Sequence, residues 1–460
     1  MTTQSSHTVK AGSTVENIFR ELNSAKIDYC LLRGFEELFT TTGFLEIDLL
    51  VKTDHLQQFS RVVAQLGFAP LPSWGHAPHS FFVAFDKERS DWIKLDVVTA
   101  LSYGTPVRRF RFHVLEKCLQ QKLNSQDIAR LAPEHEFITL LLHCLLDKET
   151  IRQAHRNRLR ELLTIISTDK RKRKRMPKLI RSSFFSIYNW DEICIVIEQE
   201  DWQVFLDKRS ALRRRFFLQQ PFSSLYRDVS ARLVRRLRPV FFALRRRGDA
   251  VALLAPDGAG KSTLAGELVK DRMLKARLVY MGGNIAARNI GLPTTRWLHR
   301  RVKALNGKAS RSPVGMLWKG LNFGNKLLEQ WFRSCTAHYY LLRGRTVIFD
   351  RYIYDSWVHK KKNGLLKRIR RFLFEAGLPK PGLVIFLDAP GEVLFRRKGE
   401  HTPEWLEQQR QSYLSLRERI PNMKIVDADR PSDSVKSEAI AAIWEHHGRR
   451  LNQKGPWKLS

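Results

Sequence analysis

The sequence predicts an α/β protein in three parts: a mixed α+β region at residues 1–150, a basic helical region at 151–248, and a doubly wound parallel sheet at 249–460. Strand-like and helix-like segments alternate regularly only in the last part, and the middle part has helical periodicity with few strand signals. A length of 460 residues suits two or three domains, and 43% hydrophobic residues are enough to form their cores.

The charge of the chain is strongly basic and uneven. It contains 80 Lys and Arg against 46 Asp and Glu, a net charge of +34. Residues 151–248 hold 25 basic and 9 acidic side chains, whereas the first 150 residues are nearly balanced. Excess positive charge favours an anionic partner: a nucleotide, a phosphorylated glycan, an acidic membrane or a nucleic acid.

The cysteines follow no metal-ligand spacing and are odd in number, which predicts reduced core residues of a cytosolic protein. They are Cys30, Cys118, Cys144, Cys194 and Cys335. No signal peptide is recognised, and no apolar run is long enough to span a bilayer. We therefore expect a cytoplasmic protein, with a peripheral position at a membrane as an alternative.

The first 150 residues mix helical and strand patterns. Helical periodicity is expected at residues 15–22 and 55–66 and again from Pro133 onward. Alternating or apolar strand patterns fall at residues 29–32, 47–51, 81–85 and 92–98. These segments predict an α+β unit followed by a helical segment.

Two basic stretches stand out in the middle region. Residues 170–175 are six consecutive Lys and Arg, and such blocks are usually solvated or disordered tails. Residues 229–247 form a basic amphipathic helix with an expected kink at Pro239. Its apolar face either lies on an anionic membrane or packs on its own domain with arginines outward. That face holds Val229, Leu233, Leu237, Phe241 and Leu244.

The last region alternates strands and helices, which predicts a parallel sheet with ligands at the carboxyl ends of its strands. The expected strands are residues 251–254, 278–281, 346–349, 383–387 and 424–426.

The first of these strands runs into a glycine-rich turn and then a helical segment. Gly258-Ala259-Gly260-Lys261-Ser262 is the core of a phosphate-binding loop, although Ala255 occupies the position of the first consensus glycine. Lys261 can reach the β and γ phosphates, and the Ser262 hydroxyl can ligate Mg²⁺. The predicted nucleotide contacts are Asp257, Gly258, Ala259, Gly260, Lys261, Ser262 and Thr263.

Polar residues follow two later strands. Asp350 can hold Mg²⁺ or accept a proton, and Arg351 can pair with an acceptor phosphate; the alternative is that both satisfy a turn. The residues Arg396, Arg397 and Lys398 can form a closing lid that stabilises a transferring phosphoryl group, or an ordinary basic helix end.

Together these motifs resemble the thymidylate kinase family of nucleoside-monophosphate kinases. The matching pieces are the loop at 257–263, Asp350-Arg351-Tyr352, the strand end at 387–390, the Arg396-Arg397 pair and the helix at 410–413. The resemblance implies ATP and Mg²⁺ as cofactors, with Ser262 and Asp350 near the metal. It also implies catalytic roles for Lys261, Asp350, Arg351, Arg396 and Arg397.

Two departures from that family concern the acceptor and the transferred charge. Residues 280–284 read Tyr-Met-Gly-Gly-Asn where members acting on thymidylate usually carry Arg-Glu-Pro, which predicts a remodelled acceptor pocket. Ala259 stands where some members carry a catalytic arginine, so the lid is expected to supply that charge.

Three carboxylates in the first region form a second pattern. Glu46 and Asp48 are two apart on one strand and therefore share a face, and Asp96 lies on another strand. With Leu31-Leu32-Arg33-Gly34 they resemble the nucleotidyltransferase superfamily, which implies that they bind Mg²⁺ on a nucleoside triphosphate. Arg33-Gly34 replaces the usual Gly-Ser, so the domain is either an active or a degenerate nucleotidyltransferase. A further alternative is that the carboxylates are ordinary alternating polar residues on a half-buried strand.

The sequence as a whole predicts an ATP-dependent phosphotransferase that acts on a nucleoside monophosphate or another phosphorylated acceptor, such as a sugar phosphate or a glycan end. One alternative is an ATP-binding protein that binds nucleic acid, although the sequence contains no nucleic-acid recognition motif. The other is a scaffold attached to a membrane through residues 229–247.

Overall fold

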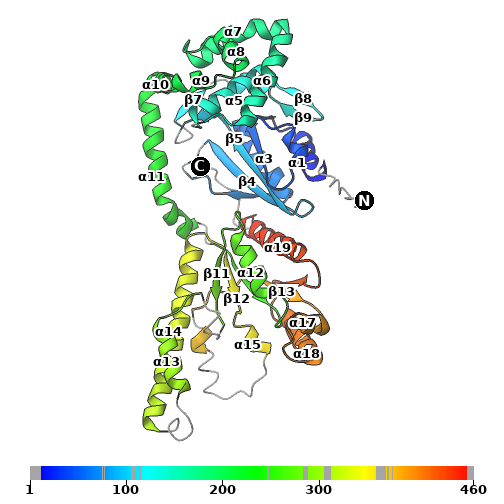
Figure 1. Ribbon diagram of the computed structural model, residues 1–460, viewed down its shortest axis with the longest axis vertical. Helices are drawn as coiled ribbons and strands as arrows, with labels where there is room; N and C mark the ends of the chain where they lie inside the picture. Colours follow the sequence, from blue (N-terminus) through cyan, green and yellow to red (C-terminus); the bar gives the residue numbers. More distant parts are fainter. Residues whose placement is uncertain are drawn as a thin grey trace. The chain divides into compact units, whose positions relative to one another are not determined.

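The computed structural model describes residues 12–74, 76, 78–104, 109–112, 115–148, 150–245, 248–282, 289–304, 312–358, 369, 372–375 and 377–452 (Figure 1). The described part of the chain divides into two compact units. The first unit comprises the chain up to Arg238 and again from Arg450 onward. The second unit runs from Pro239 to Arg449. The three-part division into functional regions remains a prediction. Among the described helices, none is both long and apolar enough to cross a bilayer.

The first unit is built on a seven-stranded mixed sheet of order β3-β4-β5-β2-β1-β9-β8. Its strands are β1 (Tyr29–Leu31), β2 (Leu45–Val51), β3 (Ala69–Leu71), β4 (His79–Asp86), β5 (Asp91–Val98), β8 (Leu123–Ser125) and β9 (Ile128–Arg130). A separate hairpin joins β6 (Leu101–Tyr103) and β7 (Phe110–Phe112). The expected strands and the expected α+β architecture are observed.

Two helices cover one face of this sheet, α1 (Gly12–Ser24) and α3 (Leu56–Gln65). Val15, Ile18 and Leu22 of α1 recur at helical spacing and are almost completely buried in a core with Phe59 of α3 and alternate residues of β2. This amphipathic pattern explains why residues 15–22 fold as a helix. The short helices α2 (Glu37–Thr40) and α4 (Leu115–Gln120) complete this part.

The helices after the sheet belong to the same unit, the last of them, α11, only as far as Arg238. They are α5 (Pro133–Leu146), α6 (Gln153–Thr168), α7 (Lys170–Phe184), α8 (Trp190–Glu198), α9 (Gln203–Asp207), α10 (Arg209–Gln219) and α11 (Pro221–Arg245). Those from α5 to α10 share one apolar core with Tyr103 and Phe110 of the hairpin.

The basic block at residues 170–175 was expected to be a solvated or disordered tail. That expectation is wrong, because the block forms the first turns of α7. Asp169 caps the helix by accepting from the backbone N–H of Arg171 at 2.8 Å and of Lys172 at 3.2 Å. Met176 and Ile180 then bury the helix in the core. The charged side chains are mostly exposed, so the helix keeps its charges solvated without unfolding.

The prediction that the cysteines are unpaired core residues is confirmed for Cys30, Cys118 and Cys144, which are buried free thiols. It is wrong for Cys335, which is exposed on a helix of the second unit, and Cys194 is only half-buried.

The second unit contains a five-stranded parallel sheet of order β11-β12-β10-β13-β14. Its strands are β10 (Ala250–Leu254), β11 (Arg277–Tyr280), β12 (Val347–Asp350), β13 (Leu383–Asp388) and β14 (Met423–Asp427). All five match the strands expected from the sequence.

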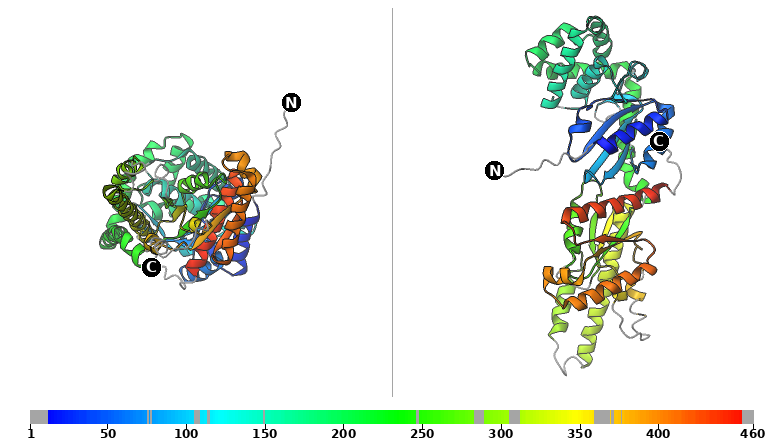
Figure 2. Two further views of the ribbon diagram at one scale, coloured as in Figure 1. Left: turned by 90° about the horizontal axis from the view of Figure 1, so that it is seen from below. Right: turned by 90° about the vertical axis from the view of Figure 1, so that its right-hand side faces the viewer.

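Helices lie on both sides of this sheet (Figure 2), as the doubly wound prediction requires. They are α12 (Lys261–Lys270), α13 (Thr294–Lys303), α14 (Pro313–Leu342), α15 (Asp355–Val358), α17 (Gly391–Lys398), α18 (Pro403–Leu414) and α19 (Ser432–Asn452). Ala250, Ala252 and Leu254 face a core with α14 and α18, whereas Val251 and Leu253 are buried on the other side of the strand. This sheet is thus covered on both faces, which leaves its strand ends to carry polar groups.

Candidate phosphate-binding site and carboxylate cluster

The turn between β10 and α12 adopts a conformation that requires glycine. Gly258 has φ +92° and Gly260 has φ +80°, both in the left-handed region. A Cβ on Gly258 would lie 2.8 Å from the carbonyl oxygen of Leu394 in α17, so a larger residue would push the two segments apart. Gly260 directly precedes α12, whose first backbone N–H groups have no partner within the helix and are available to an anion.

Lys261 is the first residue of α12 and is only 7% exposed. Its Nζ donates to the carbonyl oxygen of Ala255 at 3.1 Å, which holds the ammonium under the loop. Burial lowers the pKa of Lys261, and the carboxylates of Asp355 and Asp350 act in the opposite direction. A buried ammonium with no direct ion pair among the described residues is well suited to pair with a phosphate.

Ser262 and Asp350 meet beside this lysine. The Ser262 hydroxyl donates to Asp350 Oδ2 at 3.3 Å. Asp350 is paired in register with Leu253 because β12 lies next to β10, so both strands deliver their ends to one edge of the sheet. The other carboxylate oxygen, Oδ1, is buried and has no hydrogen-bond partner among the described residues. A hydroxyl and a carboxylate with a free oxygen form a donor set that fits Mg²⁺.

Arg351 follows Asp350 and is tied to the loop. Its guanidinium donates to Asp257 Oδ1 at 2.6 Å, and its backbone has φ +59°, an uncommon conformation for a non-glycine residue. Burial alone would lower the pKa of Arg351, but the charges of Asp257 and Asp355 outweigh burial and raise it. Arg351 is therefore held as a cation at the strand ends.

Asp355 and Tyr413 belong to the same group, although the sequence analysis assigned neither a role. Asp355 begins α15 and accepts from the Tyr413 hydroxyl of α18 at 2.9 Å through Oδ1. Its Oδ2 is buried without a partner in the described structure. Burial raises the pKa of the Asp355 carboxyl, against the lowering effect of Lys261. The one available signal was its position five residues after Asp350 in the loop that follows the strand.

The predicted lid residues lie at the end of α17 and are exposed. Arg397 donates to the carbonyl oxygen of Ala428 at 2.8 Å and lies 3.5 Å from Asp429, so it contacts the loop after β14. Burial raises the pKa of the Asp257 carboxyl, but the positive charges of Arg351 and Lys398 outweigh burial and lower it. No hydrogen bond or ion pair joins Arg396 to the loop among the described residues.

The remaining predicted contacts belong to the loop itself. Ala259 is 4% exposed and fills the turn, whereas Thr263 is exposed on the first turn of α12. A further pair supports the next strand end, where Arg410 of α18 binds both carboxylate oxygens of Asp388 at 2.6 and 3.0 Å. This bidentate bond fixes α18 against β13 and positions Tyr413 above Asp355.

The three carboxylates of the first unit also come together. Asp48 of β2 and Asp96 of β5 are paired in register on neighbouring parallel strands, and Glu46 lies two residues before Asp48. One oxygen from each of the three lies within 4.8 Å of the others. The arrangement is the one expected for a group of oxygen ligands around a divalent cation.

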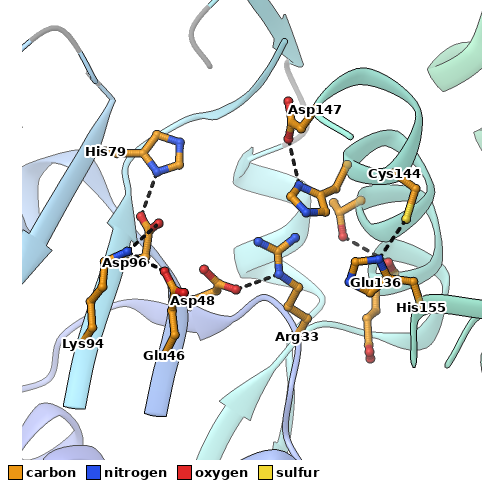
Figure 3. A network of polar contacts seen from close by, with 12 residues as sticks. Arg33, Glu46, Asp48, His79, Lys94, Asp96, Glu136, Cys144, Asp147 and His155 are labelled. Carbon is orange, nitrogen blue, oxygen red and sulfur yellow. Dashed lines mark hydrogen bonds and ion pairs between the residues drawn. The ribbon is translucent and has the colours of Figure 1, made fainter. Parts of the chain in front are cut away.

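Each of these carboxylates already has a basic partner (Figure 3). Lys94 Nζ lies 2.5 Å from Glu46 and 4.0 Å from Asp96. Arg33 Nε donates to Asp48 Oδ2 at 2.7 Å, and His79 Nδ1 lies 2.7 Å from Asp96 Oδ1. A metal ion at this point would compete with three internal cationic or polar partners.

Arg33 lies between the carboxylates and a second polar group on α5 and α6, as Figure 3 shows. There His143 Nδ1 lies 2.8 Å from Asp147 Oδ2, and Cys144 Sγ lies 3.4 Å from His155 Nδ1. Burial, helped by the positive charges of His143 and Arg33, lowers the pKa of His155 to about 4. Burial raises the pKa of the Cys144 thiol to about 12, so this cysteine is not a thiolate nucleophile.

The strand, glycine loop, buried lysine and metal-compatible oxygens of the second unit define a nucleoside-triphosphate-binding fold of the phosphate-loop class. Comparison with known proteins finds a family match over part of this unit. Residues 336–439 match the family model described as Thymidylate kinase. That match includes Asp350 and the predicted lid residues and begins after residues 257–263, the predicted phosphate loop.

Curated relatives point the same way. A probable thymidylate kinase of Archaeoglobus fulgidus is 24% identical over 203 residues, which cover 42% of this chain and 93% of that protein. Probable thymidylate kinases of Thermococcus onnurineus and Pyrococcus horikoshii are 31% and 32% identical over 118 and 115 residues. Those matches cover 23% and 22% of this chain and 55% and 54% of the relatives, so the chain spans about half of their length.

A solved structure of thymidylate kinase from Candida albicans is 22% identical and matches with a TM-score of 0.31 over 44% of this chain and 93% of that chain. The family model and the curated relatives show that the carboxyl-terminal region contains a thymidylate kinase domain, the domain of a phosphotransferase. The likeness of the first unit to nucleotidyltransferases stays a prediction.

Proposed function

We propose that the second unit transfers the γ-phosphoryl group of ATP to a small phosphorylated acceptor. The observation that carries this proposal is the meeting of Lys261, Ser262 and Asp350 at the carboxyl ends of β10 and β12. In the reaction the bond between the γ-phosphorus and the bridging oxygen of ADP breaks, and a bond from an acceptor oxygen to that phosphorus forms. Such transfer depends mainly on placement and positive charge, which this group supplies.

Each residue of the group has a distinct part in this proposal. Lys261 leaves the Ala255 carbonyl and pairs with the β and γ phosphates, while the loop amides wrap them. Ser262 and Asp350 hold Mg²⁺, which neutralises charge on the phosphates when bound. Arg351 exchanges its bond with Asp257 for the acceptor phosphate, and the lid cations Arg396, Arg397 and Lys398 cover the transferred group.

The acceptor class is the open part of the proposal. The thymidylate kinase match favours a nucleoside monophosphate. Residues 280–284 read Tyr-Met-Gly-Gly-Asn where Arg-Glu-Pro is usual in that family, which favours a changed pocket. Gly282 accepts from Arg333 through its carbonyl oxygen at 3.1 Å, so this strand end is held by α14. A sugar phosphate or phosphorylated glycan end is therefore the second acceptor class to test.

The test is a screen of acceptors with ATP labelled at the γ position. The panel contains thymidylate, the other nucleoside monophosphates and a series of sugar phosphates, each with Mg²⁺. We expect label to pass to at least one phosphorylated acceptor and ADP to form in equal amount. Hydrolysis of ATP with no labelled acceptor in any class, or no nucleotide binding at all, contradicts the proposal.

The carboxylate cluster favours a second candidate function for the first unit, nucleotidyl transfer. Glu46, Asp48 and Asp96 supply oxygen ligands that would hold one or two divalent cations on a triphosphate. The ion pairs with Arg33 and Lys94 must open for this to occur. Release of pyrophosphate from labelled ATP, lost in Asp48→Asn and Asp96→Asn, supports an active transferase. Absence of Mn²⁺ binding to the wild-type cluster supports a degenerate domain.

A further inference from the structure

The helix α11 presents a row of large apolar side chains to solvent. Within the first unit the row occupies four turns, from Phe222 to Leu237. Phe222 and Tyr226 are 86% and 74% exposed, and every member of the row is at least 41% exposed. The members are Phe222, Leu225, Tyr226, Val229, Leu233 and Leu237, which we call the α11 stripe.

The spacing of these residues puts them on one side of the helix. Each of them lies three or four positions from another member, which is the helical repeat, and only Leu225 and Tyr226 are adjacent in sequence. Four turns of helix extend over about 22 Å. The stripe is thus a continuous apolar face rather than scattered exposed residues.

The opposite side of the same helix is attached to the protein by small and polar residues. Ser224, Asp228 and Ala231 are 1%, 6% and 0% exposed. Arg238 donates to the carbonyl oxygen of Pro72 at 3.2 Å, which ties this side to the loop after β3. An ordinary surface helix buries its apolar side, whereas α11 exposes its apolar side and buries its small and polar residues. This excludes the expected packing of Val229, Leu233 and Leu237 on their own domain.

The charge around the stripe is positive. Arg232 and Arg236 are exposed and lie three residues after Val229 and Leu233, at the margin of the stripe. The acidic side chain of α11 is Asp228, which is buried and bound to Arg232 at 2.8 Å. A second copy docked symmetrically on the stripe would bring the arginines of both copies together with no exposed acid of α11 to pair with them.

We propose that the α11 stripe docks on the surface of an anionic lipid bilayer. Its apolar side chains enter the boundary between headgroups and acyl chains, and Arg232 and Arg236 contact the lipid phosphates. This inference is separate from the kinase proposal, because it uses residues outside the phosphate site.

The test uses the full chain and vesicle flotation. Vesicles of phosphatidylcholine alone are compared with vesicles that also contain phosphatidylglycerol. We expect the wild-type chain to float with the anionic vesicles and to be released by high salt. The triple variant Phe222→Gln, Val229→Gln, Leu233→Gln should lower the bound fraction by about tenfold or more, since three apolar side chains no longer leave water.

Matched controls separate this effect from general ones. Leu123→Gln with Ile195→Gln removes apolar side chains that are 41% and 51% exposed in the same unit, and should float like the wild type. Arg236→Gln should weaken anionic binding more than Arg175→Gln, an exposed arginine of α7. Circular dichroism melting confirms that each variant is folded.

Two results overturn the inference. One is a wild-type chain that stays with neither type of vesicle. The other is a folded triple variant that floats as well as the wild type. If vesicles are not bound and sedimentation shows dimers that the triple variant abolishes, the stripe is an interface between copies and the membrane assignment is wrong.

Discussion

Asp350 occupies the most demanding position of the phosphate site. One of its oxygens accepts from Ser262, and the other is buried without a partner among the described residues. An unsatisfied buried carboxylate oxygen is costly, so its retention is explained if a cation or a proton donor occupies that side in the working enzyme.

This leads to a first prediction. Asp350→Asn keeps the shape of the side chain and removes its charge, so phosphoryl transfer should fall by about a hundredfold or more. ATP binding should change little, because Lys261 and the loop remain. Steady-state kinetics and nucleotide titration separate the two effects. Unchanged turnover would remove Asp350 from the chemistry.

A second prediction at this scale concerns the pH dependence of stability. The pKa of His155 is about 4 in the folded chain, against an ordinary value of 6.5, chiefly because burial disfavours the imidazolium. Since the unfolded chain binds the proton more readily, this contribution is present above pH 6.5 and is lost as the pH falls toward 4.

Lowering the pH from neutral to about 5 should therefore reduce the free energy of unfolding of the wild type more than that of His155→Gln. Because solvent screens this half-exposed side chain, we expect a difference of about 1 kcal/mol. Urea titrations that follow the first unit at both pH values measure this. Equal pH dependence of the two proteins would show that His155 protonates freely in the folded state.

The site residues that could be predicted from the sequence are those that belong to a recognisable motif. The loop residues, Asp350 and Arg351 were found because they follow strands with a recognisable spacing. Asp355 and Tyr413 were missed because their meeting depends on how α18 packs over β13, which the Asp388–Arg410 pair fixes. Lys94 and His79 were not recognised as partners of the carboxylate cluster, because the strand register brings them to it. Lys94 lies on β5 with Asp96, and His79 lies on the neighbouring strand β4.

The element that most constrains the phosphate site is the turn from β10 to α12. Gly258 is required both by its positive φ and by the nearness of the Leu394 carbonyl in α17. Gly266 lies within α12 with no atom near its missing Cβ. Gly266 is therefore a suitable control for Gly258, because both glycines lie in the same strand–loop–helix segment and only Gly258 is close to another segment.

The third prediction compares them. Gly258→Ala should abolish nucleotide binding or lower it by at least about tenfold, because the loop must move away from α17. Gly266→Ala should preserve binding and should stabilise the chain by up to about 1 kcal/mol through helix propensity. Isothermal titration with ATP and thermal unfolding supply the two readouts. Tight ATP binding by the folded Gly258→Ala variant would contradict the assigned loop geometry.

Strands and helices with strong periodicity were predictable, and the five strands of the parallel sheet are the best case. Two elements were not. The block at 170–175 folds as helix because Asp169 caps it and Met176 and Ile180 bury it, which a charge count does not reveal. The outward direction of the α11 stripe was undecided, because periodicity shows that a helix has an apolar face and does not show what covers it.

The molecule as a whole combines two units with separate polar sites. The phosphate site lies within residues of the second unit, and the carboxylate cluster lies within the first. No residue is shared between them. The sequence predicted both groups, and family comparison supports only the kinase part.

The fourth prediction follows from this separation. Asp48→Ala should leave the rate of phosphoryl transfer within about twofold of the wild type, because its partner Arg33 is in the first unit. The same assay that follows labelled acceptor measures it. A strong loss of transfer in a folded Asp48→Ala chain would mean that the two sites act together.

In the proposed transfer, the buried ammonium of Lys261 binds the triphosphate. The measurement is the transfer of γ-label from ATP by Lys261→Ala beside Lys270→Ala, which changes an exposed lysine at the other end of α12. We expect Lys261→Ala to lose transfer by about a hundredfold or more and Lys270→Ala to keep the wild-type rate. Equal rates in the two variants would show that Lys261 does not bind the triphosphate.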